Sequence, residues 1–232
     1  MAVLVLRLAG PLQSWGVDSK FNRRSSGTEP SKSGVIGLVA AAMGRSREDP
    51  IDDLAKLRFG VRKDQIGRVI TDFHTAHTYG DKSDSYVTYR QYITDSVFLA
   101  AFEGDKKKLE EVQSALESPV FPLYLGRRSC PPCGKICLGL FDGTLDTVLD
   151  GFDWQASEWY KRRMAKQLQL EIVVDSEGGY EVNDYPISFD QNHRRFARRQ
   201  VRFRYTDRII DNPLGKEKFG TTGHDAMAAL RG

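Results

Sequence analysis

The sequence predicts an α+β fold built around one large core. With 232 residues, of which 40% are hydrophobic, the chain is long enough to bury most of the surface that its unfolded form exposes. Residues 3–8 form an almost continuous apolar run, which is typical of a central strand covered on both faces. Residues 106–116 carry apolar side chains at helical spacing instead. Helices and strands are therefore expected to share this core.

The first 142 residues give the order strand, helix, strand, hairpin, strand, helix, strand. A long Gly-, Ser- and Pro-rich loop separates the first strand from a helix that begins at Ser31 or Ser33 and ends before Gly44. A second short helix is expected over residues 49–57. The remaining core elements are strands at 58–62, 97–102 and 136–141 and the helix at 106–116. Without the hairpin, this is the order of a ferredoxin-like or RNA-recognition (RRM-type) domain.

A long β-hairpin is expected to project from this domain over residues 64–95. Two alternating stretches, 68–77 and 85–93, are joined by a turn-like segment. Their aromatic residues are interleaved with polar ones on both faces, which does not suit a buried strand. We therefore predict a ferredoxin-like domain over residues 1–142 with this hairpin as an insertion.

The composition changes after Asp142. A short helix near 145–149 precedes three strand-like stretches, at 168–174, 180–187 and 198–205, which predict a smaller β-rich unit over 143–210. Residues 211–232 contain four glycines and show little periodicity, so a mobile tail is expected there.

Composition also excludes several classes of protein. The chain has 34 Lys plus Arg against 31 Asp plus Glu, and a net charge of +3 gives no sign of bulk affinity for polyanions. The longest apolar run, residues 35–43, is far shorter than the roughly 20 residues that cross a bilayer. The N-terminal residues do not resemble a secretory signal. A cytoplasmic protein without a membrane partner is expected.

The three cysteines fall together, at positions 130, 133 and 137. Cys130 and Cys133 resemble half of a zinc knuckle, but a closed structural site needs four ligands. No second cysteine pair is present in the sequence, and a histidine ligand would have to come from far away. We expect neither a metal nor another cofactor.

Arginines are concentrated in residues 193–208, which hold seven of them and a single acid. On a strand, their planar guanidinium groups would line one face, where they could bind phosphate or a protein partner. The alternative is a solvated sheet face whose arginines pair with acids such as Asp184 and Asp190.

Three glycine-bordered segments are further candidates for an anion or nucleic-acid site. In residues 10–16, Gln13 offers an amide for base edges and Trp15 an indole for stacking, although Trp15 would equally suit the core. In residues 124–130, Gly126 allows close backbone approach before Arg127 and Arg128, as in an anion-binding turn or an ordinary loop.

The third segment is the helix start at residues 31–34. Backbone N–H groups at a helix N-terminus attract phosphate, and Lys32 would add charge, although an ordinary capped start is equally consistent. His74 and His77 on the hairpin could serve acid–base chemistry. At a spacing of three on a strand they point to opposite faces, so they do not form one catalytic pair.

Together these segments resemble a known family. Residues 6–16, 31–38 and 124–131 resemble the three signature segments of the CasD family of CRISPR-associated RAMP proteins. Residues 72–75 and 89–92 also resemble the flanks of that family's projecting thumb. The resemblance covers residues 1 to about 140 and is weaker beyond Asp142.

The resemblance implies a RAMP-type ferredoxin-like fold with a thumb between the second and third core strands. It also implies a non-catalytic subunit of type I-E Cascade that caps the 5′ handle of the guide RNA. Such a subunit contacts the CasC backbone and docks CasA, and it meets target DNA only through the complex. A related subtype cuts its own repeat RNA, so a metal-independent endoribonuclease is the alternative.

The expected RNA site combines the resemblance with the residues themselves. Lys32, Arg127 and Arg128 would neutralise phosphates, and Arg90 and Tyr92 would be thumb contacts. The pocket would be shaped by other residues of the same loops, namely Gln13, Trp15, Ser33, Gly34 and Gly126.

Overall fold

The computed structural model describes residues 1–16, 23–78 and 81–216, with the side chains of residues 76–84 left out. Residues 217–232, most of the expected tail, lie outside this part. The helices are α1 (Lys32–Ala42), α2 (Asp52–Ala55), α3 (Lys106–Glu117), α4 (Leu145–Gly151) and α5 (Glu158–Lys161). The strands are β1 (Ala2–Ala9), β2 (Leu12–Gln13), β3 (Arg23–Arg24), β4 (Arg58–Gln65), β5 (Arg68–Thr78), β6 (Asp81–Thr94), β7 (Val97–Gly104), β8 (Cys137–Asp142), β9 (Gln167–Leu168), β10 (Glu171–Ser188), β11 (Arg195–Tyr205) and β12 (Ile210–Asp211).

The main sheet has six strands in the order β11-β10-β4-β7-β1-β8, and every neighbouring pair is antiparallel. The apolar run predicted as a central strand is β1, which pairs with β7 on one side and β8 on the other. The expected α+β class, with antiparallel sheets, is confirmed.

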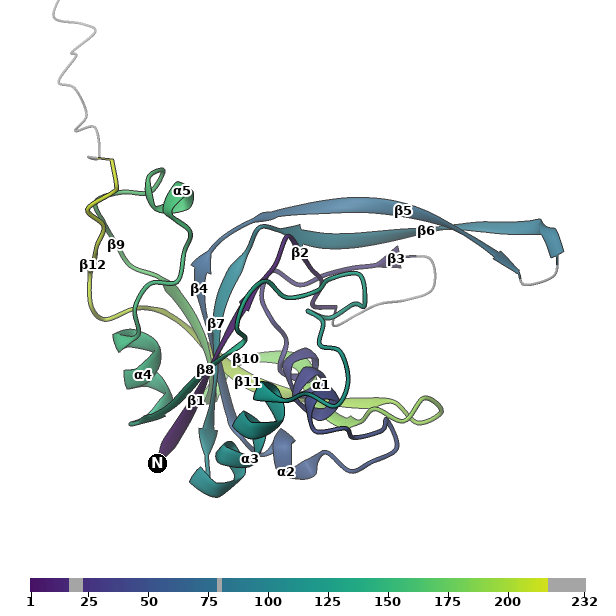
Figure 1. The fold of residues 1–232 in the computed structure, drawn as a ribbon, viewed down its shortest axis with the longest axis horizontal. Helices are drawn as coiled ribbons and strands as arrows, with labels where there is room; N and C mark the ends of the chain where they lie inside the picture. The colour runs from purple at the N-terminus through teal and green to yellow at the C-terminus, as the bar shows by residue number, and fades with distance from the viewer. Residues whose placement is uncertain (17–22, 79–80, 217–232) are drawn as a thin grey trace, which may run out of the picture.

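Alternation along β1 divides the core into two layers. Leu4 and Leu6 belong to the cluster that α1 and α3 cover, whereas Val3 and Val5 belong to the smaller cluster beneath α4. All four side chains are fully buried. The sheet therefore carries helices on both faces (Figure 1).

The predicted hairpin consists of β5 and β6, which pair along their length and project from the body (Figure 1). The free edge of β6 pairs with β2 and, in parallel, with β3, so a second small sheet forms at the base of the hairpin. This arrangement brings the loop before α1 against the hairpin.

The strands expected in a smaller C-terminal unit extend the main sheet instead. Residues 172–174 of β10 pair with residues 60–62 of β4, and β11 pairs with β10. Two strands were expected over 168–187, but β10 runs through both, with an irregularity between Asp175 and Tyr180. Gly179 lies so close to β11 that an added Cβ would be 2.2 Å from the Val201 carbonyl oxygen. This bulge hides the continuity of β10 from the sequence pattern.

A buried ion pair within β4 holds the segment after α4 through further hydrogen bonds. The Arg62 guanidinium donates to the Asp64 carboxylate at 2.7 and 2.9 Å, and neither side chain is exposed. Arg62 also donates to the carbonyls of Leu149, Phe152 and Asp153, at 2.6 to 2.9 Å. These bonds satisfy the end of α4, which would otherwise leave buried carbonyls unpaired.

Candidate nucleic-acid interface

The loop at residues 10–16 is held by its own buried polar groups. The Gln13 side chain donates to the Ser96 carbonyl at 2.7 Å and accepts from the Trp15 indole N–H at 3.0 Å. Trp15 is 1% exposed and Gln13 is fully buried. The interpretation in which both are offered to RNA bases is therefore wrong, and the core alternative for Trp15 is confirmed. These two residues fix the shape of the loop.

The start of α1 packs directly beneath Trp15. Ser31 caps the helix by accepting from the Gly34 backbone N–H at 3.3 Å, and Ser33 is buried. A Cβ at Gly34 would lie 2.9 Å from Trp15 Cε3, so only glycine fits beneath the indole without a shift.

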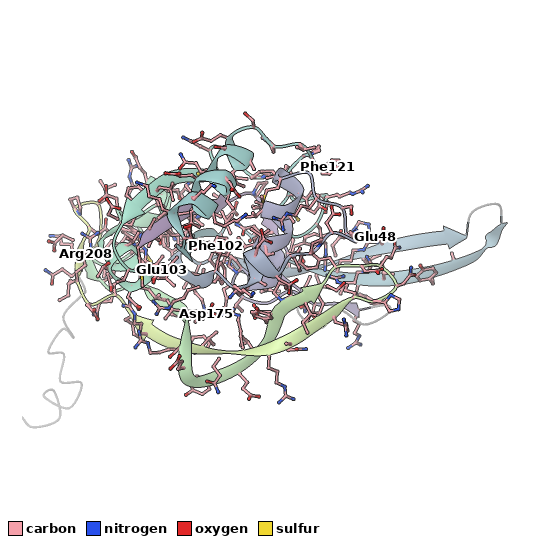
Figure 2. All side chains as sticks on the ribbon, turned by 90° about the horizontal axis from the view of Figure 1, so that it is seen from below. Glu48, Phe102, Glu103, Phe121, Asp175 and Arg208 are labelled. Atoms are coloured by element: carbon pink, nitrogen blue, oxygen red, sulfur yellow. The ribbon has the colours of Figure 1, made fainter. Side chains whose placement is uncertain are left out.

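Lys32 does not face solvent, and this corrects its expected role in phosphate binding. It is 3% exposed, and its ammonium forms an ion pair with Asp175 of β10 at 2.9 Å; the place of Asp175 in the fold is labelled in Figure 2. The Asp184 carboxylate accepts from the Lys32 backbone N–H at 2.7 Å. Burial lowers the pKa of Lys32 and outweighs the attraction of Asp175. The helix N-terminus that was expected to attract phosphate is thus already occupied by a carboxylate.

The loop at 124–130 is fixed to the loop at 10–16. The Ser14 backbone N–H donates to the Leu125 carbonyl at 3.0 Å. Gly126 has φ +87°, and a Cβ there would lie 1.7 Å from the Ser14 carbonyl oxygen. The close backbone approach that was expected at Gly126 is present, but to another loop of the same chain.

Arg127 joins this loop to the hairpin. Its guanidinium donates to the Gln91 carbonyl of β6 at 3.1 Å and to the Arg24 carbonyl of β3 at 2.9 Å. It also lies over the Tyr92 ring, 4.8 Å from the centroid, and Tyr92 is only 3% exposed. Arg127 therefore holds β3 against β6, and Tyr92 supports Arg127 from beneath.

The expected residues fall into a supporting group and an exposed group. Gln13, Trp15, Gly34, Gly126 and Tyr92 form the support of the site. Four exposed or half-exposed arginines on the adjoining strands and loop form no ion pair with a carboxylate among the residues that the structure describes: Arg23, Arg24, Arg90 and Arg128. Arg23 and Arg24 lie in the long loop before α1 and were not among the predicted site residues, although two adjacent arginines there were a visible signal.

Most arginines of residues 193–208 are paired with acids. Arg199 binds the Asp184 carboxylate with two hydrogen bonds, at 2.5 and 2.9 Å, and also bonds Asp175 at 2.5 Å. Arg202 and Arg204 pair with Asp146, and Arg198 pairs with Glu181. For these four the ion-paired alternative is correct. Asp190, the other acid expected there, lies 3.5 Å from His193 instead.

The histidines of the hairpin lie along β5. His74 Nε2 is 2.7 Å from an Asp72 carboxylate oxygen, and both side chains are about half exposed. The side chain of His77 lies outside the described part of the chain.

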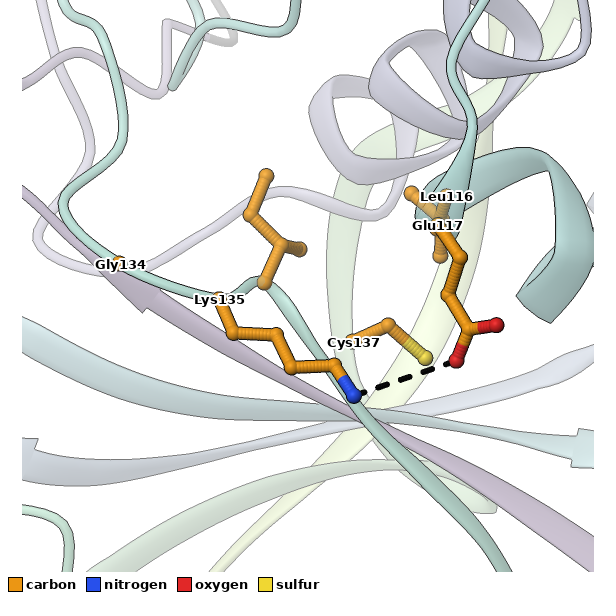
Figure 3. A pocket seen from close by; sticks show the side chains of 6 residues that line it. Leu116, Glu117, Gly134, Lys135 and Cys137 are labelled. Carbon is orange, nitrogen blue, oxygen red and sulfur yellow. Dashed lines mark ion pairs between the residues drawn. The ribbon is translucent and has the colours of Figure 1, made fainter.

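Neither the cysteines nor the hollow beside them joins this site. All three thiols are free, and burial raises the pKa of Cys130 and Cys137. No group of three or more His, Cys, Asp or Glu that could hold a metal ion occurs within residues 1–16, 23–78 and 81–216. A 3.9 Å ion pair of Lys135 and Glu117 crosses the open hollow in Figure 3, between the end of α3 and residues 134–137. None of the described helices is long and apolar enough to span a bilayer.

Known proteins share both the sequence and this architecture. The family described as CRISPR-associated protein (Cas_Cas5) matches residues 3–202. The chain is 35% identical to the CRISPR system Cascade subunit CasD of Escherichia coli (strain K12) over 156 residues, 59% of this chain and 70% of that protein.

Two solved structures are also similar. One is described as a Cas protein, with 35% identity, a TM-score of 0.70 and 93% of this chain and 98% of the other covered. The second is a chain of a CRISPR RNA-guided surveillance complex, with 30% identity, a TM-score of 0.75 and coverage of 99% and 98%. The chain therefore belongs to the CRISPR-associated protein (Cas_Cas5) family and is of the CasD type.

Proposed function

We propose that this protein is the non-catalytic subunit of a type I-E Cascade complex that binds and caps the 5′ handle of the guide RNA. The supporting observation is the cluster of exposed arginines at the base of the hairpin, carried on a rigid support of largely buried residues. A similarity of 30% identity over 99% of the chain to a subunit of an RNA-guided surveillance complex agrees with this role.

Within this proposal, the strands β8-β1-β7-β4 with α1 and α3 are the RAMP-type ferredoxin-like core. The β5–β6 hairpin is the thumb. The protein acts in the cytoplasm, where it joins the CasC backbone to CasA and meets target DNA through the complex. It needs no cofactor.

The cationic surface suits an unpaired RNA end. Phosphates are bound by the charge of Arg90 and Arg128, and Arg127 adds charge while it holds β3 in place. Lys32 takes no part, because its ammonium is already paired with Asp175.

A double substitution tests the proposal. We expect Arg127→Ala with Arg128→Ala to weaken binding of a labelled single-stranded RNA that carries the repeat-derived 5′ end. The slope of log affinity against log salt should fall by about 0.7 for each phosphate that is no longer neutralised. Arg198→Ala with Arg202→Ala is the matched control, because it removes the same charge from β11. Unchanged affinity and slope in the first variant, or an equal decrease in the control, contradicts the proposal.

The endoribonuclease alternative has one observation in its favour, the 2.7 Å contact between His74 and Asp72. Nε2 of His74 has no hydrogen-bond partner of good geometry within the described chain, so this contact alone does not orient a general base. Incubation of the protein with repeat RNA in EDTA separates the two functions. We expect intact RNA, whereas specific cleavage that His74→Ala abolishes would establish the endoribonuclease.

A further inference from the structure

A row of three side chains crosses the small sheet at the base of the hairpin. In its register, Phe73 of β5 pairs with Tyr89 of β6, and Tyr89 pairs with Arg23 of β3. Cross-strand partners project from the same face of a sheet and lie about 5 Å apart. Phe73 is 69% exposed, Tyr89 is 50% exposed, and Arg23 is exposed too. We call these three residues the aromatic row.

The side chains of the aromatic row are largely free of ring and charge contacts within the described chain. Within the described chain, neither ring makes a ring–ring contact, and no carboxylate pairs with Arg23. Exposed aromatic side chains that lie next to each other form apolar surface of the kind that binding sites use. The pairing next to this row, of Asp72, Arg90 and Arg24, projects from the opposite face, so cations lie on both faces of the sheet.

We propose that the aromatic row stacks one unpaired base of the guide RNA while Arg23 binds the adjoining phosphate. This inference rests on the proposed function and adds residues to it. Two rings beside a guanidinium match the chemistry of a nucleotide, which has a π-face and an anionic phosphate. A protein partner would also cover the rings, but would need an acidic group opposite Arg23 as well.

The edge strand β3 links the row to the rest of the site. Arg127 donates to the Arg24 carbonyl, so it holds the strand that carries Arg23 against Tyr89. Arg90 projects from the opposite face, so an RNA strand that contacts both Arg90 and the rings would pass around the edge strand β3.

Two variants separate the contribution of base stacking from that of charge. In the full-length protein, Phe73→Ala with Tyr89→Ala should weaken binding of the labelled handle RNA about ten-fold, with an unchanged salt slope. Arg23→Ala should lower the slope by about 0.7. Phe73→Tyr with Tyr89→Phe should bind as the wild type does. Tyr180→Ala with Phe203→Ala is the matched control, because these exposed rings lie 5.7 Å apart on β10 and β11.

Abasic substitutions along the RNA identify the stacked base. One abasic position should weaken binding to the wild type but cause no further decrease in the Phe73→Ala, Tyr89→Ala variant. Binding of that variant within twofold of wild type overturns the inference. If the Phe73→Ala, Tyr89→Ala variant binds RNA as the wild type does but fails to enter the assembled complex, the rings contact a protein partner instead. If the RNA affinity falls only in the Arg127→Ala, Arg128→Ala variant, the proposed function is supported and the stacking site is refuted. If the affinity falls in none of the variants, both the proposed function and the stacking site are contradicted.

Discussion

The Asp184 carboxylate accepts a hydrogen bond from the Lys32 backbone N–H at 2.7 Å. The same carboxylate is bound from the other side by Arg199, at 2.5 and 2.9 Å. A strand of the C-terminal half thus supplies the negative charge that the first turn of α1 attracts. The helix start that resembles an anion site is therefore a contact between the N-terminal and C-terminal halves of the chain.

Removal of the Asp184 charge should destabilise the protein without affecting RNA binding. Asp184→Ala leaves the buried Arg199 with Asp175 alone, so we expect the free energy of unfolding to fall by about 3 kcal/mol. Urea denaturation measures this change. Lys32→Met is the companion variant, because it removes a cation that was expected to bind phosphate. The slope of log affinity against log salt for handle RNA should be the same in Lys32→Met as in the wild type. A lower slope would show that Lys32 does bind phosphate.

The sequence predicts the core elements well because their patterns are local. The apolar run of β1 and the helical spacing of α3 depend on their own residues alone. The continuity of β10 was missed because its bulge interrupts the alternation, and its pairing with β4 joins residues far apart in the chain. Long-range pairing of that kind leaves no signal in a local pattern.

Sequence reasoning singled out segments that the structure brings together, but it could not separate buried supporting residues from exposed ones. Gln13, Trp15 and Tyr92 were expected to contact or shape the RNA site, yet all three are buried. Whether an amide or indole faces inward depends on its hydrogen-bond partners, here the Ser96 carbonyl for Gln13. That partner lies 83 residues away, so no local sequence pattern indicates the hydrogen bond.

Two glycines of α1 should respond in opposite ways to the same substitution. Gly34→Ala places a Cβ 2.9 Å from Trp15 Cε3, and overpacking of this kind destabilises by about 1–3 kcal/mol. Gly37→Ala meets only Phe189 at 3.8 Å, and alanine is the better helix former by about 1 kcal/mol. We therefore expect a lower melting temperature for the first variant and an equal or higher one for the second. Equal decreases in both would show that Gly34 is not required by Trp15.

Acid should weaken the junction of α1, α2 and α3. The two hydrogen bonds from Arg45 to Asp53, both at 2.6 Å, outweigh burial and, with Lys108, hold the pKa of Asp53 below its usual value. A carboxyl with a lowered folded-state pKa stabilises the fold above its unfolded pKa of about 4 and loses that contribution as the pH falls further. Because the group is partly exposed, its contribution is about 1 kcal/mol.

Asp53→Asn should therefore lower the free energy of unfolding at pH 7, and the difference from wild type should shrink below about pH 4. Denaturation at a series of pH values measures it. Asp52→Asn, the neighbouring substitution on α2, is the control, because it removes a carboxylate that forms no ion pair within the described chain. A difference between wild type and Asp53→Asn that persists undiminished at low pH would show that the ion pair is not its source.

Arg127 is expected to act mainly by holding β3 against β6, and the Arg127→Lys substitution tests whether its guanidinium geometry is required. The two carbonyls it binds, of Gln91 and Arg24, belong to separate strands and need the two arms of a guanidinium. Arg127→Ala and Arg127→Lys should therefore both release β3 and speed tryptic cleavage after Arg23 and Arg24. Arg128→Ala, on the same loop, should leave this rate unchanged. If Arg127→Lys is cleaved as slowly as wild type, charge alone holds β3 in place and the bridging role is refuted.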